Sequence, residues 1–126
     1  MNIPADLRYT KEHEWVKADG GLAIVGITDY AQGELGDIVF VELPPVGTEV
    51  QQDSPFGTIE AVKAVSDLFS PVTGKVTEAN SALDDDPMLI NRDPYGEGWM
   101  IKVELSDAAQ LEQLLDSAGY RKLIEE

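Results

Sequence analysis

The residue of this chain best suited to carry chemistry is Lys63, which lies in the run from Gly57 to Pro71. Small apolar residues flank it on both sides, and no other lysine occurs between Lys17 and Lys75. A lysine in such a setting is expected to project from the tip of a hairpin with nothing bulky beside it. An enzyme could acylate its amine there, and the acylated side chain would then serve as a swinging arm.

Two other roles for Lys63 stay open from the residues alone. A lysine at a turn most often serves solubility or discourages association of sheet edges. A catalytic lysine needs burial or a cationic neighbour to be activated, whereas the charged neighbours here, Glu60 and Asp67, are acidic. The window therefore permits a carrier lysine or an inert surface lysine, and it favours a nucleophile least.

Cysteine is absent from the chain, and histidine occurs once, as His13. The lack of cysteine excludes structural disulfides, thiolate metal sites and cysteine nucleophiles. One histidine leaves little for histidine-based catalysis or a multi-histidine metal site, and no phosphate-binding glycine loop is present. A stand-alone enzyme is thus disfavoured, and any redox chemistry of sulfur must come from an attached group.

The 126 residues include 9 basic and 24 acidic side chains, which gives a formal net charge of −15. Such a surface repels phosphate backbones and anionic lipid, so neither nucleic acid nor a membrane is expected as a partner. It attracts basic faces of partner proteins, although acidity can also serve solubility alone. The start of the chain has no features of a signal or transit peptide, so we expect a cytoplasmic protein.

The elements that must position Lys63 are predicted to be mostly short strands in one domain spanning residues 1–126. We expect strands at 14–18, 22–27, 37–43, 55–62, 65–70, 75–79 and 99–105. One short helix is expected at 29–35, with Thr28 as N-cap and Gly36 at its end. A polar connector with room for a helical turn spans 80–86, and a loop spans 91–98. The fold class is mainly β, a sandwich or distorted barrel.

The last segment, 106–126, is expected to be helical because the spacing of its apolar residues changes. Ser106 is a candidate N-cap, and apolar residues follow at helical spacing at positions 111, 114, 115 and 118. Gly119 is expected to end this helix. Residues 120–126 would then form one last helical turn or a frayed tail.

The hairpin at 55–70 is expected to turn at Lys63 and Ala64, which places Glu60 opposite Asp67 across the strands. Like charges directly opposite are destabilising, and the usual Asn-Gly turn is missing. These residues are therefore not the ones expected for a hairpin whose only role is structural. They suit a tip whose lysine and flanks are read by another protein.

Motifs along nearly the whole chain resemble those of the H protein family of the glycine cleavage system. Residues 60–64 and 66–74 resemble the family's lipoylation site, and other family motifs match at 13–16, 26–32, 35–44 and 91–99. Several distinctive motifs in the right order are more specific than one lysine window. The resemblance implies a lipoyl-type barrel-sandwich hybrid with a lipoyl hairpin near 55–70 and a C-terminal helical extension near 106–126.

The resemblance also implies the cofactor and the partners. Lipoate would be attached covalently to Lys63 by a lipoate ligase or a lipoyl/octanoyl transferase. The arm would take the aminomethyl group of glycine from glycine decarboxylase and deliver it to aminomethyltransferase, and dihydrolipoyl dehydrogenase would reoxidise it. The chain would be a carrier and not an enzyme. An alternative function for the same lysine is a relay that donates lipoate to other lipoyl domains.

Two details at the tip bear on the attached group. The tip is not of the Met-Lys-Met type found in biotin carriers, which favours lipoate over biotin. Ala61 stands where the family pattern usually has serine. Because alanine is small, we expect Lys63 to stay accessible and to be modified.

A cleft that shelters the loaded arm from water is a further implication of the resemblance. Glu14 and Asp67 are the candidates to hold the ammonium group of the arm, because charge-assisted bonds are strong. Glu12 lies nearby, where related chains have a hydroxyl residue, and would make the cleft more acidic. Both glutamates could equally be solvated strand charges. His13 could line the cleft or fill the core beside Trp15.

Overall fold

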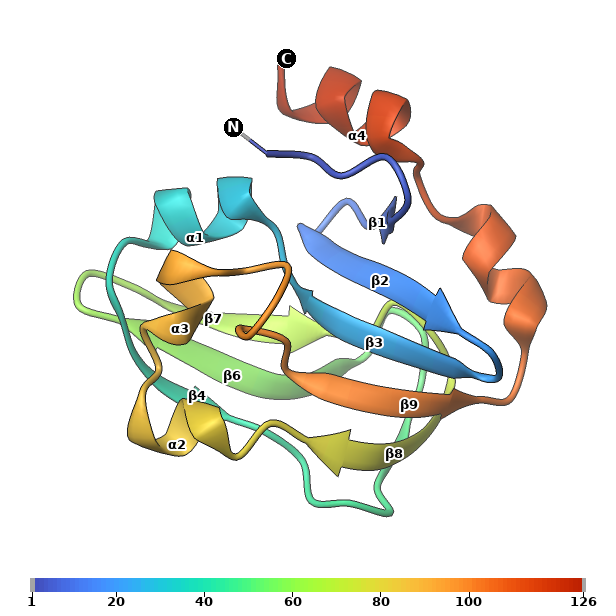
Figure 1. Cartoon of the computed structure of the whole chain (residues 1–126), viewed down its shortest axis with the longest axis horizontal. Helices are drawn as coiled ribbons and strands as arrows, with labels where there is room; N and C mark the ends of the chain where they lie inside the picture. Colours follow the sequence, from blue (N-terminus) through green and yellow to red (C-terminus); the bar gives the residue numbers. More distant parts are fainter. Residues whose placement is uncertain (1, 126) are drawn as a thin grey trace.

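The computed structural model of the chain describes residues 2–125 and is built mainly from β-strands (Figure 1). The strands are β1 Arg8–Tyr9, β2 Glu14–Asp19, β3 Leu22–Ile27, β4 Ile38–Glu42, β5 Glu49–Val50, β6 Pro55–Ala61, β7 Val65–Phe69, β8 Gly74–Ala79 and β9 Ile101–Leu105. One sheet has six strands in the order β1-β2-β3-β9-β8-β5, and the other has three in the order β4-β6-β7. The predicted strands are confirmed within a few residues, whereas the two-residue strands β1 and β5 had no signal in the sequence.

Short helices lie at the ends and edges of these sheets (Figure 1). They are α1 Asp29–Leu35, α2 Ala82–Asp85, α3 Leu89–Arg92, the 3-10 helix η1 Ala108–Gln113 and α4 Ser117–Ile124. Helix α1 has the predicted bounds, because Thr28 accepts a hydrogen bond from the Ala31 N–H and Gly36 ends the helix at a φ of 82°. None of the described helices is long and apolar enough to cross a membrane.

The two sheets pack face to face over one main apolar core. Alternate side chains of each strand point inward, so Val16 and Val25 of the larger sheet meet Ile59 and Leu68 of the smaller one in this core. All four are at most 1% exposed. The mainly β, two-layer class predicted from the sequence is therefore confirmed.

A second apolar cluster includes the N-terminal segment, the start of β2 and helix α4. Trp15, Tyr9 and Tyr120 are its large members, and all three are almost fully buried. Trp15 packs flat over Gly26, where a Cβ atom would lie only 2.8 Å from the indole ring. The first residues of β2 are thus covered on both faces, which places Glu14 and Val16 toward the interior between the sheets.

The predicted C-terminal helical segment is confirmed, but it is not one continuous helix that begins after Ser106. The cap of the first helical piece is Asp107, whose side chain accepts from the Ala109 N–H, and this piece is the short 3-10 helix η1. The chain then becomes extended, because Leu115 pairs with Tyr9 through two main-chain hydrogen bonds of 2.8 and 2.9 Å. Tertiary pairing with β1 therefore overrides the helical spacing of the leucines.

The predicted break at Gly119 is also wrong. Asp116 caps α4 by accepting from the Gly119 N–H at 2.8 Å, so this glycine lies in the first turn of the helix. Tyr120 is 0% exposed, and the residues around it form a docked helix. The loop predicted at 91–98 begins later, because Asn91 and Arg92 belong to α3.

The hairpin register differs from the predicted one. Strand β6 pairs with β7 so that Glu60 lies opposite Val65 and Asp67 lies opposite Thr58. The two central residues of the turn are therefore Val62 and Lys63. The Glu60–Asp67 pair expected from the sequence does not form, and no repulsion across the strands has to be explained.

Candidate functional site

Lys63 lies at the tip of the β6–β7 hairpin, and its side chain is exposed. The tip is attached to the rest of the smaller sheet, because the Val62 N–H donates to the main-chain oxygen of Asp37 at 3.1 Å. The lysine side chain runs beside Gly36. A Cβ atom there would lie 3.3 Å from Lys63 Cε and 3.9 Å from Nζ, so the amine lies next to the end of α1.

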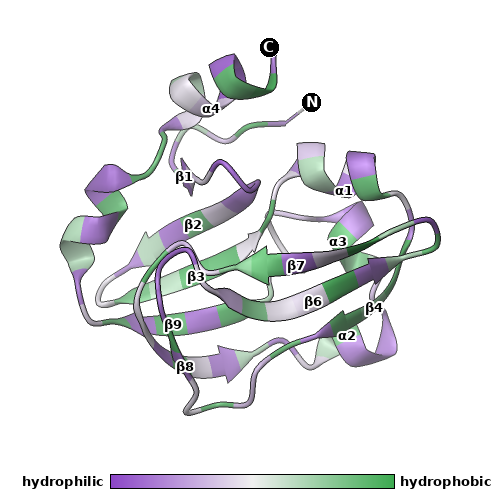
Figure 2. Cartoon of the chain, turned by 180° about the vertical axis from the view of Figure 1, so that it is seen from behind, coloured by the Kyte–Doolittle hydropathy of each residue, from purple (hydrophilic) through white to green (hydrophobic). Residues whose placement is uncertain are grey.

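Exposed apolar side chains gather around this lysine. Val62 and Val65 of the hairpin are 77% and 65% exposed, and Phe40 on β4 is 53% exposed. Phe40, Glu60 and Val65 lie directly opposite one another on three adjacent strands, so they share the outer face of the smaller sheet. Figure 2 shows green, hydrophobic segments at the hairpin tip as well as inside the strands. Exposed apolar side chains that gather in one place are typical of surfaces that contact other proteins.

A cavity of about 240 Å³ lies beside the hairpin, between the edge strand β7, helix α1 and the turn that joins β1 to β2. We call it the acidic cavity, because four of its lining residues are carboxylic acids. Its lining residues are Glu12, His13, Glu14, Ile27, Tyr30, Ala31, Glu34, Leu35, Ile59, Ser66, Asp67 and Leu68. The four cleft residues predicted from the sequence are all among them.

Glu14 is the buried acid of this cavity, with only 2% of its surface exposed. Its Oε1 accepts from the Thr10 hydroxyl at 2.6 Å, and its Oε2 receives a longer contact of 3.4 Å from the Phe69 N–H. Burial raises the pKa of Glu14 to about 8, even though these two hydrogen bonds act in the opposite direction. Burial therefore favours the neutral acid, whereas a cation beside Glu14 would favour the carboxylate.

Glu12 and Asp67 are exposed lining residues. They face the cavity from two different segments, the β1–β2 turn and the edge strand β7. A cationic group in the cavity would thus lie near the buried Glu14 and the exposed Glu12 and Asp67. Glu34 of α1 is a fourth acid in the lining.

His13 takes part in both the cavity wall and the packing. Its backbone has a φ of 72°, the left-handed region that few residues other than glycine and asparagine adopt. Its ring lines the cavity, lies 5.0 Å from the Tyr30 ring, and its Nδ1 is 2.8 Å from the Tyr120 hydroxyl. Burial lowers the pKa of His13, although Glu12 and Glu34 oppose this shift. Trp15, the neighbour expected from the sequence, belongs to the second apolar cluster.

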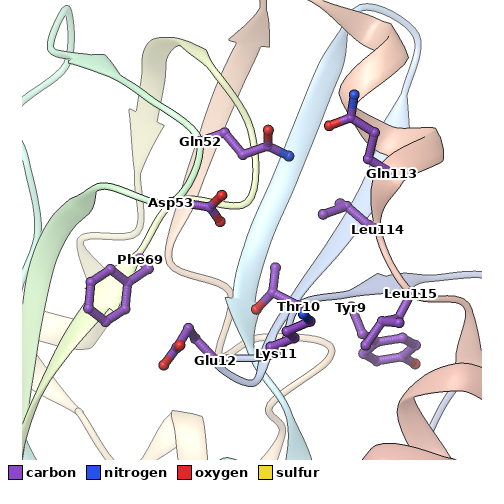
Figure 3. A pocket seen from close by; sticks show the side chains of 10 residues that line it. All are labelled: Tyr9, Thr10, Lys11, Glu12, Gln52, Asp53, Phe69, Gln113, Leu114 and Leu115. Atoms are coloured by element: carbon purple, nitrogen blue, oxygen red, sulfur yellow. The ribbon is translucent and has the colours of Figure 1, made fainter.

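A larger cavity, of about 440 Å³, lies near the other end of the hairpin (Figure 3). Figure 3 shows Gln52, Asp53 and Phe69 on one side of it, and Leu114 and Leu115 on the other. Phe69 is six residues from Lys63, which is about 20 Å along a strand, whereas Ser66 of the acidic cavity is only three residues away. The acidic cavity is therefore the one that lies beside the lysine.

Among the residues of this site that were not expected from the sequence, three bear on its chemistry: Tyr30, Glu34 and Thr10. Tyr30 and Glu34 line the acidic cavity from α1, and Thr10 holds the carboxyl group of Glu14. The i, i+4 spacing of Tyr30 and Glu34 could have placed them on one face of the predicted helix. Nothing in the sequence indicates which way that face points.

Together, these features define a small β protein that presents an exposed lysine beside an acidic cavity. The family described as glycine cleavage H-protein matches residues 7–126. The chain therefore belongs to the glycine cleavage H-protein family, which confirms the resemblance found in its motifs.

Individual relatives agree with this assignment. The glycine cleavage system H protein of Symbiobacterium thermophilum is 59% identical over 119 residues, which cover 94% of this chain and 93% of that protein. The protein of the same name from Brevibacillus brevis is 56% identical over 100% of both chains. A crystal structure of a glycine cleavage system H protein from Mycobacterium marinum has a TM-score of 0.90 and 41% sequence identity, covering 98% of this chain and 100% of that one.

Proposed function

We propose that this chain is the lipoyl carrier of the glycine cleavage system and transports the aminomethyl group of glycine on Lys63. The observation that carries the proposal is the placement of one exposed lysine beside the acidic cavity. The Lys63 side chain runs next to Gly36, and the two residues before Gly36, Glu34 and Leu35, line that cavity. A group attached to the amine thus begins at the cavity wall.

The residues at the tip fit a covalently attached lipoyl group, whose disulfide would supply the chemistry that accepts and releases the aminomethyl unit. Lys63 is exposed and the turn holds it away from the core. Ala61, the departure from the family's serine, is only 5% exposed and lies opposite Ile38 inside the sheet. Because its side chain does not reach the outer surface, this substitution leaves the surface read by a lipoate ligase or transferase unchanged.

The acidic cavity fits the cationic amine of a loaded arm. Glu14 provides a carboxyl group in a site with little solvent, where a charge-assisted hydrogen bond is strong. Asp67 and Glu12 provide further carboxylates in the lining. Apolar lining residues such as Ile59 and Leu68 limit the access of water. We therefore assign the cavity the task of slowing hydrolysis of the loaded arm.

The enzymes that act on the arm must all reach the same tip. In this role the partners are glycine decarboxylase, aminomethyltransferase and dihydrolipoyl dehydrogenase, together with the enzyme that attaches lipoate. The exposed apolar side chains of Val62, Val65 and Phe40 surround the lysine and offer a contact surface for them. The net charge of −15 favours partners whose docking faces are basic.

The attachment site is tested by intact-mass measurement after expression with lipoate and a lipoylating enzyme. The wild-type chain is expected to gain one lipoyl group, and Lys63→Arg is expected to gain none while keeping the same fold. Lys75→Arg is the matched control and should be modified normally. A lipoyl mass that persists in Lys63→Arg would refute the assignment.

The sheltering role is tested by the lifetime of the loaded arm in Glu14→Ala and Asp67→Ala. Each variant loses one charge-assisted partner of the amine, so hydrolysis is expected to accelerate on the order of tenfold. Release of formaldehyde or ammonia reports the rate. Unchanged lifetimes in both variants would rule out a protective cavity while leaving the carrier lysine intact.

A further inference from the structure

Tyr120 of α4 is a completely buried residue with a polar group at its tip. It is 0% exposed, and its ring stacks on the ring of Tyr9 at a centroid distance of 4.8 Å and an interplanar angle of 12°. Its hydroxyl oxygen is 2.8 Å from His13 Nδ1 and 2.8 Å from Thr28 Oγ1. The ring is thus held by stacking, and the hydroxyl group makes separate contacts of its own.

The two partners of this hydroxyl belong to two different walls of the acidic cavity. His13 lines the cavity from the β1–β2 turn. Thr28 is the N-cap of α1, where its Oγ1 accepts from the Ala31 N–H, and the first turn of this helix supplies Tyr30 and Ala31 to the lining. One oxygen atom on a third element therefore connects the turn wall to the helix wall.

The backbone conformation of His13 needs contacts that hold it in place, and the Tyr120 hydroxyl provides one of them. A non-glycine residue with a φ of 72° costs free energy and persists only where its surroundings fix it. The main-chain oxygen of His13 accepts from the Thr28 N–H at 3.0 Å, which fixes the backbone side of the turn. The Tyr120 hydroxyl fixes the imidazole side. The orientation of this turn matters because it carries Glu12 and leads directly into Glu14, the first residue of β2.

We propose that Tyr120 is a positioning residue for the acidic cavity: its hydroxyl group holds the turn wall and the helix wall in the arrangement that shelters the loaded arm. This rests on the proposed carrier function. Neither the ring stacking nor the apolar packing of α4 needs the oxygen atom. Tyr120→Phe therefore separates the positioning role from the packing role.

The test compares Tyr120→Phe with Tyr9→Phe in the lipoylated, loaded protein. Tyr9→Phe is a matched control, because its hydroxyl is also buried and donates to the main-chain oxygen of Pro4, away from the acidic cavity. Both variants lose a phenol oxygen from the same stacked pair, so similar losses of thermal stability are expected. Only Tyr120→Phe is expected to shorten the lifetime of the loaded arm, on the order of tenfold.

A second readout does not depend on the arm. His13 is the single histidine of the chain, so its ring nitrogens give NMR signals that need no assignment. In the unmodified wild type, Nδ1 is expected to show the shift of a hydrogen-bonded nitrogen. Tyr120→Phe is expected to change this shift and the populations of the two tautomers, and Tyr9→Phe is expected to leave both unaltered.

The outcomes separate this proposal from the carrier function. Equal lifetimes in Tyr120→Phe and Tyr9→Phe would overturn the positioning role, as would a wild-type Nδ1 that behaves as a solvent-exposed nitrogen. The latter measurement remains decisive even if Tyr120→Phe fails to fold. If Glu14→Ala and Asp67→Ala retain normal lifetimes, the protective function itself fails, whatever the imidazole signals show.

Discussion

At the scale of single residues, Glu14 shows how the fold places a carboxyl group where it could bind the amine of a loaded arm. It points toward the interior because it shares a face of β2 with Val16, and Thr10 holds its carboxyl group in place. At this buried position a neutral acid costs less free energy than an unpaired charge. When a cationic amine enters, the carboxylate becomes favourable and a proton leaves. Loading of the arm is therefore expected to be coupled to proton release near neutral pH.

The same carboxyl group predicts a specific dependence of stability on pH. Its pKa is about 8 in the folded chain against an ordinary value of 4.5, so the folded state retains a proton that the unfolded state loses. The contribution of protonated Glu14 to the free energy of unfolding is fully present below pH 4.5 and is lost as the pH rises to about 8. From pH 5 to 8, the wild type should lose on the order of 3 kcal/mol more than Glu14→Gln.

Urea unfolding of the unmodified proteins at these two pH values measures this difference. Glu49→Gln is the control, because it removes an exposed carboxylate of β5 that does not contribute to the pKa of Glu14. It should follow the wild type across the pH range. Parallel losses in the wild type and Glu14→Gln would show that Glu14 ionises normally.

The exposed lysine at the hairpin tip and the acids that line the cavity could be predicted from sequence motifs, but the residues that position them could not. Tyr120 follows a glycine in a segment whose spacing gave no sign of docking. Its partners His13 and Thr28 lie 107 and 92 positions away. A sequence pattern reports periodicity within a segment and not which distant segments meet.

At the scale of elements, the hairpin shows that the alternation of inward and outward side chains determines the face of each residue but not the pairing register. The predicted and observed registers differ by two residues along β7, so both place Ile59 and Leu68 on the inner face. The hydrophobic pattern cannot distinguish them. Contacts from outside the hairpin favour the observed register, because Ala61 pairs with Ile38 and the Val62 N–H bonds to Asp37.

The end of α1 provides a prediction about the neighbourhood of Lys63. Gly36 has φ 82° and ψ −157°, a region open almost only to glycine. Gly36→Ala is expected to lower the free energy of unfolding by about 1–3 kcal/mol and to push the Lys63 side chain away. Chemical denaturation measures the first effect.

Gly33→Ala is the control with the opposite expected sign. Gly33 lies inside α1, and no atom lies within 4 Å of the position that a Cβ atom would take there. Alanine should therefore stabilise the helix by about 0.5–1 kcal/mol. If both substitutions change stability equally, the backbone strain inferred at Gly36 is not real.

At the scale of the whole molecule, the charge of −15 should govern how fast partners find the tip. Because salt shortens the range of electrostatic attraction from about 30 Å at 0.01 M to about 10 Å at 0.1 M, lipoylation at low protein concentration should slow several-fold over this range. The measurement is kcat/KM of the lipoylating enzyme for the unmodified chain.

The location of the charges can be resolved with two double variants. Asp37→Asn with Glu60→Gln removes exposed carboxylates beside the tip, and Asp107→Asn with Glu112→Gln removes two from the C-terminal segment. The first pair should weaken the salt dependence more than the second. If kcat/KM depends on salt concentration equally in both double variants, net charge alone controls the rate at which the enzyme encounters the chain.

The second apolar cluster has a consequence for the dynamics of the cavity. Helix α4 packs in that cluster, outside the main core between the sheets. Detachment of α4 would free the Tyr120 hydroxyl from both walls while the two sheets stay folded, which is a sub-global opening with a free energy below that of global unfolding. The docking free energy of this terminal helix, rather than the stability of the β core, would then set how often the cargo is exposed to water.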